Sequence, residues 1–178
     1  MSSISKIFQT TCLVSMYQAL CSKLDAIGAW LPQLGLRLLL AWEFGEAGFE
    51  KLHGSNWFAD ITFPFPFNLL PPDFSWGMAT FFEIVGAFAL VFGIATRFFS
   101  LSLIILTIVA ISAVHWPEHF SSLSELLKGY RIIDENEDGF GNYKLPLMYL
   151  IMFLPLLFSG AGKASIDHLI KRCMNKPV

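Results

Sequence analysis

The feature that most constrains the fold is an apolar run at residues 98–116, whose first ionisable side chain is His115. A helix needs ~20 apolar residues to cross the hydrocarbon core of a bilayer, so this run predicts a transmembrane helix. The composition supports a membrane protein, because 54% of the residues are hydrophobic and 15% are charged, whereas about a quarter are charged in soluble domains. The net charge of −2 gives no electrostatic case for a nucleic-acid partner.

Three further segments complete the predicted fold, which is all-α: an integral membrane four-helix bundle. The predicted spans are residues 31–49, 75–96, 98–116 and 145–159. The first span is the weakest by hydropathy, because it contains Arg37, Glu43 and Glu46. Its apolar stretch at 34–42, and the need of the other helices for a partner, still favour a membrane crossing.

The distribution of lysine and arginine predicts the topology. Eight of these residues fall on the side of the N-terminus and four on the other, so both termini are expected in the cytoplasm (N-in/C-in). Within residues 1–30, apolar side chains recur at spacings of three and four from Leu13, which is typical of an amphipathic helix on the cytoplasmic membrane face. A helix packed on another protein would show the same pattern. Residues 31–170 form the predicted transmembrane domain, and residues 171–178 form a basic cytoplasmic tail.

Two outer segments are long. Residues 51–73, called the lid below, are too apolar for a water-filled loop and too rich in proline for a helix. Such backbone does not face hydrocarbon unpaired, so we expect the lid to lie at the membrane interface or to fold back over the bundle, anchored by Trp57, Phe63, Phe65 and Phe67. The second outer segment is residues 117–143, and within it residues 134–139 (DENEDG) match the start of an EF-hand loop. The twelfth position is a leucine instead of glutamate, which favours an ordinary acidic turn over a calcium site.

The candidate site consists of ionisable side chains predicted in the outer half of the bundle: Glu43, Glu46, Glu83 and His115. Glu43 and Glu46 share one face of the first helix, and Glu83 lies ~10 Å deep in the second. Charged groups inside a membrane are costly, so they usually face the interior and have a role. A cluster that moves protons or orients a quinone, a metal site, and a structural hydrogen-bonded cluster all fit these residues. We take the four as candidate catalytic residues, assign no metal ligand, and leave the cofactor open with a quinone as the candidate.

The sequence does not decide whether the chain is an enzyme. It contains no phosphate-binding loop, no GxSxG, no HExxH and no Rossmann fingerprint. The three cysteines form no CxxC pair, which argues against a thiol relay.

Several short stretches resemble the DoxX family, and others resemble its HvfX branch. The first group is 36–37 (LR), 47–51 (AGFEK), 82–83 (FE), 93–97 (GIATR) and 160–167 (GAGKASID). The second group is 56–58 (NWF), 63–71 (FPFPFNLLP), 115–117 (HWP) and 141–146 (GNYKLP). The resemblance covers residues 31–170 and implies a four-helix bundle in the bacterial inner (plasma) membrane.

The resemblance also implies a functional setting. DoxX-like proteins are linked to thiosulfate–quinone oxidoreductase subunits and to oxidative-stress membrane complexes. The HvfX branch is associated with the maturation of copper-binding, ribosomally made and modified peptides (RiPPs), in which the copper belongs to the peptide. We therefore expect a membrane accessory or oxidoreductase-like component in the maturation or handling of such a peptide. Its partners would be the lipid bilayer and either RiPP-modifying enzymes or a precursor peptide. Copies of the chain itself, in a homo-oligomer, are a further candidate partner. The alternatives are a non-catalytic scaffold for cytoplasmic modifying enzymes and a small peptide or metabolite transporter.

Overall fold

The computed structural model describes residues 3–117, 122–124 and 142–174, with side chains from Val14 onward in the first helix. Within these residues the regular secondary structure is entirely helical, which confirms the all-α prediction. The elements are α1 (Ser3–Gly28), α2 (Leu31–His53), the 3₁₀ helices η1 (Phe58–Asp60) and η2 (Phe67–Leu69), α3 (Pro72–Phe92), α4 (Thr96–Ala110), the π-helix η3 (Ile111–His115), α6 (Lys144–Ser159) and α7 (Ile166–Met174).

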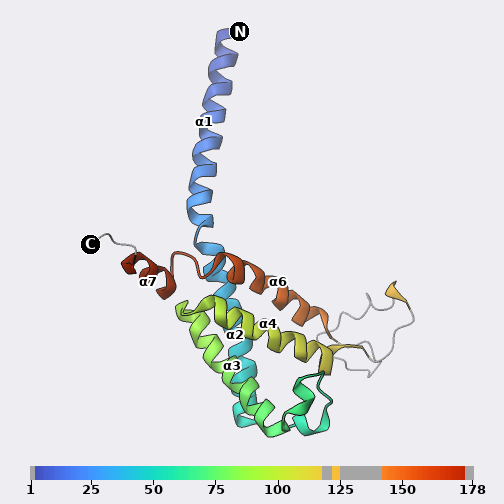
Figure 1. Ribbon diagram of the computed structural model, residues 1–178. Coiled ribbons are helices and arrows are strands. Elements are labelled where there is room, and N and C mark those ends of the chain that lie inside the picture. Colours follow the sequence, from blue (N-terminus) through green and yellow to red (C-terminus); the bar gives the residue numbers. More distant parts are fainter. Residues whose placement is uncertain (1–2, 118–121, 125–141, 175–178) are drawn as a thin grey trace.

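Helices α2, α3, α4 and α6 pack around one apolar core (Figure 1). The most extensive contact is between α2 and α3, and α6 packs mainly on α4. Large apolar side chains such as Trp42, Phe88 and Phe158 stay exposed on the outside, as expected where lipid is the solvent. The buried core residues are Leu40, Ala41 and Phe44 of α2, Ala87 and Leu90 of α3, Leu103 of α4, and Phe153 and Leu156 of α6.

Three helical segments are long and apolar enough to cross a membrane: Val14–His53, Pro72–Phe92 and Thr96–His115. They contain most of the first three predicted spans. Helix α6 is also apolar but has 16 residues, fewer than the ~20 that span the hydrocarbon core. A crossing by the fourth span therefore remains a prediction, and so does the N-in/C-in orientation.

Proline and glycine set the two ends of α3. Pro72 opens the helix, where its fixed φ is already helical and its missing N–H is not needed. Gly93 ends the helix in a left-handed conformation, at φ 66° and ψ 47°. A Cβ atom at Gly93 would lie 2.5 Å from the Cβ of Ser165, so the close approach of residues 160–165 also requires glycine. The predicted span 75–96 therefore runs past the true end of the helix.

One end of the bundle carries the turn between α3 and α4, and we call it the turn end. There Arg37 of α2 joins its own helix to the end of α3 and to the segment after α6. This side chain is 1% exposed although it is charged. Its guanidinium group donates hydrogen bonds to carbonyl oxygens at the end of α3 and in the segment after α6, so each nitrogen of this buried cation has a partner. The acceptors are Leu90 (2.7 Å), Val91 (2.6 Å), Ala161 (3.0 Å) and Ala164 (2.8 Å).

Asp167 completes the same assembly from the start of α7. Its two carboxylate oxygens accept the backbone N–H groups of Ala95 (2.8 Å) and Thr96 (2.9 Å), and so cap α4 from a distant segment. Its own N–H group donates to the carbonyl of Gly93 at 2.9 Å. We call Arg37, Gly93, Asp167 and residues 160–165 the clasp.

Helix α1 extends away from the bundle as a near continuation of α2 (Figure 1). A short turn at Ala29 and Trp30 separates the two helices. Taken over its whole length, α1 does not separate apolar from polar residues, so the amphipathic stripe predicted from Leu13 onward is not confirmed. Its position on a membrane face remains a prediction. The acidic turn at 134–139 lies outside the described residues.

Candidate functional site

A cavity of about 580 Å³ lies at the opposite end of the bundle, called the lid end, where it is lined by α2, α3, α4, α6 and the lid. Its volume falls in the range of small-molecule sites, which are mostly apolar with a few polar groups. The aromatic lining residues are Phe44, Trp57, Phe58, Phe63, Phe67, Phe82 and Tyr149. The polar lining residues are Glu43, Lys51, Ser75, Glu83, Ser102, Thr107 and His115.

The lid covers this cavity with aromatic side chains, which is the second of the two arrangements expected from the sequence. Phe58 in η1 is buried, and its ring packs edge-on against Trp57 at 5.0 Å and against Trp76 at 5.0 Å between ring centroids. Phe63 packs on Phe58 in the same way at 4.9 Å. Such edge-to-face pairs fix ring positions as well as burying area. Phe65 does not line the cavity and is 79% exposed, so it is not one of the anchors.

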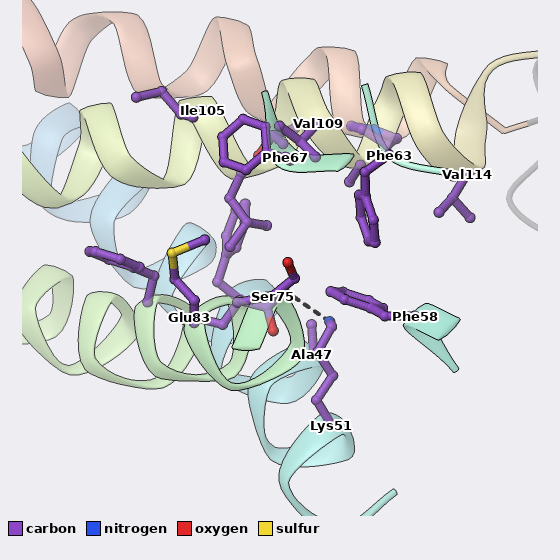
Figure 2. A pocket seen from close by; sticks show the side chains of 18 of the residues that line it. Ala47, Lys51, Phe58, Phe63, Phe67, Ser75, Glu83, Ile105, Val109 and Val114 are labelled. Carbon is purple, nitrogen blue, oxygen red and sulfur yellow. Dashed lines mark hydrogen bonds and ion pairs between the residues drawn. The ribbon is translucent and has the colours of Figure 1, made fainter. Parts of the chain in front are cut away.

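The most buried charged group at the cavity is Glu83 of α3, which is 3% exposed. Its Oε1 atom pairs with Nζ of Lys51 on α2 at 2.9 Å (Figure 2). The two helices come close here because position 48 is glycine: a Cβ atom there would lie 2.7 Å from Cγ1 of Ile84 and 3.0 Å from Cβ of Glu83. A buried carboxylate is tolerated only when paired, and Lys51 supplies that partner.

Two polar atoms at this site have no hydrogen-bonding partner within the described part of the chain. They are Oε2 of Glu83 and Oγ of Ser75, which is 5% exposed. Both residues line the cavity from α3, and Figure 2 shows the Glu83 carboxylate reaching into it beside the Lys51 amine. Buried polar atoms without partners are uncommon and call for an explanation, such as a bound molecule.

A second polar group faces the cavity from α2 and α6. The hydroxyl of Tyr149 donates a hydrogen bond to Oε2 of Glu43, and both residues line the cavity. His115, at the end of the π-helix η3, also lines it, and its Nδ1 atom is hydrogen-bonded to Oδ1 of Asn142. A π-helical turn inside or at the end of an α-helix is often found at functional sites.

The structure brings three of the four candidate residues together. Glu43, Glu83 and His115 line one cavity, although each has a different hydrogen-bonding partner. Glu46 does not join them: it is exposed on the outside of α2, where its Oε2 accepts a hydrogen bond from Nε1 of Trp42 at 3.2 Å. Three residues turn a helix by 300°, so Glu46 is rotated about 60° from Glu43, enough to leave the cavity.

Sequence reasoning missed several polar cavity residues, among them Tyr149 and Ser75. The signal for Tyr149 was present, because it is the one hydroxyl inside the apolar part of the fourth predicted span before Ser159. Ser75 gave no signal, because a serine near the start of a span is usual. No group of three or more His, Cys, Asp or Glu side chains is placed to hold a metal ion among the residues the structure describes.

Comparison with known proteins gives two matches. The profile of the DoxX family matches residues 32–116, which contain α2, α3 and α4 with Arg37, Lys51, Glu83 and His115. A protein of Haemophilus influenzae (strain KW20 / Rd) described as uncharacterized is 45% identical over 152 residues, which cover 84% of this chain and 90% of that protein. No solved structure matches.

Proposed function

Because the chain belongs to the DoxX family of membrane proteins, we propose that it is a membrane accessory or oxidoreductase-like component whose lid-end cavity binds a quinone-class ligand. A quinone is an apolar ring with polar oxygen substituents, and it dissolves in the bilayer in which such a protein sits. The cavity has the matching character, with aromatic walls and a few buried polar groups.

The observation that carries this proposal is the combination of an aromatic cavity with buried polar atoms that the described chain leaves without partners. A purely structural role for Glu83 would favour full pairing of its carboxylate, because each unpaired buried atom costs free energy. The volume of about 580 Å³ is enough for one substituted ring and the first part of a tail.

The polar groups also suggest how the chain would act on such a ligand. Interconversion of quinone and quinol moves two protons together with two electrons. Glu43 and Glu83 are carboxylates at the cavity wall and can accept or deliver protons. In this proposal a partner oxidoreductase exchanges the electrons, which makes the present chain an accessory component.

Ligand binding tests the proposal directly. A benzoquinone with one isoprene unit is titrated into the purified protein, and the dissociation constant is measured by calorimetry. Ala47→Phe places a ring inside the cavity and should weaken binding by at least ~10-fold, equivalent to ~1.4 kcal/mol. Ala59→Phe adds the same ring at an exposed lid position and should leave binding unchanged.

Two results would count against the cavity as a ligand site. One is the absence of any saturable binding to the wild-type protein. The other is unchanged binding in Ala47→Phe, provided that thermal unfolding shows this variant to be folded.

We propose further, on the resemblance to the HvfX branch, that this component serves the maturation or handling of a copper-binding modified peptide in the bacterial inner membrane. The test is co-expression of a precursor peptide and its modifying enzymes with and without this chain. Mass spectrometry should show less modified peptide when the chain is omitted. Equal modification in both cultures would remove the peptide from the proposal and leave the ligand site standing.

A non-catalytic scaffold is a second candidate, favoured by α1. This helix projects from the bundle, and its described side chains, including Leu20 and Leu24, are largely exposed. Deletion of residues 1–26 should abolish capture of a modifying enzyme in a pull-down while ligand binding at the lid end is unchanged. Retained capture would argue against a scaffold built on α1.

A further inference from the structure

We infer that the lid-end cavity selects a ligand that donates hydrogen bonds, and so prefers the hydroxyl-bearing hydroquinone form to the quinone form. This inference rests on the proposed function and names the chemical form of its ligand. It follows from the donor and acceptor inventory of the cavity wall.

Glu83 presents an acceptor to the cavity. Its Oε1 atom is occupied by Lys51 at 2.9 Å, while Oε2 is buried and has no partner within the described residues. An ionised carboxylate oxygen only accepts hydrogen bonds, so the group that satisfies it must carry a proton. A phenolic hydroxyl does so, whereas a quinone carbonyl would place its own lone pairs against the carboxylate.

Ser75 is the second unpartnered group on the same helix. Its hydroxyl can donate and accept, so it can pair with the oxygen of a ligand hydroxyl while that hydroxyl donates to a carboxylate. The other aliphatic hydroxyl groups on the wall are already used as donors. Ser102 donates to the carbonyl of Phe98 at 3.0 Å, and Thr107 donates to the carbonyl of Leu103 at 2.7 Å.

The Tyr149 hydroxyl is likewise committed, because it donates to Glu43. Lys51 has further N–H donors beyond the one it gives to Glu83, but Oε2 of Glu83 is the buried, unpartnered wall atom among the described residues that can only accept. A site with buried acceptors rejects a ligand without a matching donor, because the acceptors then stay unpaired after water has been excluded.

The experiment compares three molecules of nearly equal shape on the wild-type protein under anaerobic conditions. They are tetramethyl-1,4-hydroquinone, tetramethyl-1,4-benzoquinone and the dimethyl ether of the hydroquinone. The hydroquinone should bind on the order of 10–100-fold more tightly than the other two. The dimethyl ether separates hydrogen-bond donation from oxidation state, because it is reduced but has no donor.

Two variants test the named residues. In Glu83→Gln the amide oxygen can keep the contact with Lys51 while its NH₂ group faces the cavity, so the preference should shift toward the quinone by at least ~10-fold. Ser75→Ala should weaken the binding of hydroquinone and quinone alike, because the Ser75 hydroxyl can donate to the oxygen of either form. Ser102→Ala is the matched control and should leave the preference unchanged, because that hydroxyl is already bonded to a backbone carbonyl.

The outcomes separate this inference from the proposed function. If the quinone or the ether binds the wild-type protein as tightly as the hydroquinone, the inference is wrong and the ligand site stands. If none of the three molecules binds, both the inference and the proposed function fail. A preference for the hydroquinone that Glu83→Gln leaves intact would also overturn the assignment to Glu83.

Discussion

Replacement of Arg37 by methionine should strongly destabilise the protein, because it removes the charged centre of the clasp. Arg37 is 1% exposed and donates four hydrogen bonds to backbone carbonyls in two segments. Methionine keeps a similar unbranched stem, ends where Nε stands in arginine, and has no donor. Arg97→Met is the matched control, because Arg97 lies at the same end of the bundle, is exposed, and donates to the carbonyl of Phe158 at 3.0 Å.

The expected magnitude follows from the bonds that are lost. A hydrogen bond to a charged group contributes roughly 1.5–3 kcal/mol, so four such bonds give an upper bound of ~6–12 kcal/mol. Part of this is offset, because the buried guanidinium no longer loses its hydration and because Leu90 keeps a bond from the N–H group of Gly93 at 3.2 Å. We expect a net loss of about 3–5 kcal/mol for Arg37→Met, as for other broken buried charge arrangements. For Arg97→Met we expect a loss of ~0–1 kcal/mol.

Thermal unfolding of the purified protein in detergent, followed by tryptophan fluorescence, measures the difference. A loss of about 3–5 kcal/mol lowers Tm by roughly 6–20 °C in a chain of this length. Arg37→Lys should recover less than half of this loss, because an ammonium group keeps the charge but cannot reach four carbonyls in fixed directions. Equal Tm values for Arg37→Met and Arg97→Met would refute the view that the clasp stabilises the bundle.

Two further predictions concern the same end of the bundle. Gly93→Ala should destabilise the protein by roughly 2–4 kcal/mol, because alanine is strained at φ 66° and its Cβ would lie 2.5 Å from that of Ser165. Gly77→Ala is the control, because Gly77 lies in open space within α3. That variant should be neutral or stabilise the protein by up to ~1 kcal/mol. A Tm that falls no further in the first variant than in the second would contradict this reasoning. Asp167→Ala should cost ~1–2 kcal/mol, because the N–H groups of Ala95 and Thr96 lose their acceptors. Hydrogen exchange should then speed up at the start of α4, and unchanged exchange there would argue against the cap.

The sequence predicted the helices well and their ends less well. Hydropathy located the cores of α2, α3 and α4, because the need for ~20 apolar residues is independent of how the helices pack. The ends depend on single residues: α2 continues beyond Phe49 to His53 because no breaker occurs before Gly54, and α3 stops at Gly93 because that residue turns left-handed. Hydropathy does not detect either effect.

The sequence also predicted only part of the candidate site, because packing decides which side of a helix faces inward. The rule that intramembrane charges face the interior correctly placed Glu43 and Glu83 at one cavity. It failed for Glu46, because a rotation of about 60° separates the inside of a helix from its outside and periodicity does not fix the absolute rotation. It also said nothing of Tyr149, whose partner Glu43 lies on a helix more than 100 residues earlier in the chain.

The clasp lies at one end of the molecule, and the cavity for which we propose ligand binding lies at the other. Several of the stretches that resemble the DoxX family, with Arg37, Gly93 and Asp167, meet in the clasp at the turn end. The cavity lies at the other end, since Lys51 follows Arg37 by 14 residues on α2, ~21 Å along the helix. Between these two ends, α2 and α3 approach each other closely at small residues such as Gly48. This contact fixes how the two helices are aligned at both ends. Because the clasp lies outside the cavity, we expect substitutions of cavity-wall residues other than the Lys51–Glu83 pair to cost the fold less than substitutions in the clasp.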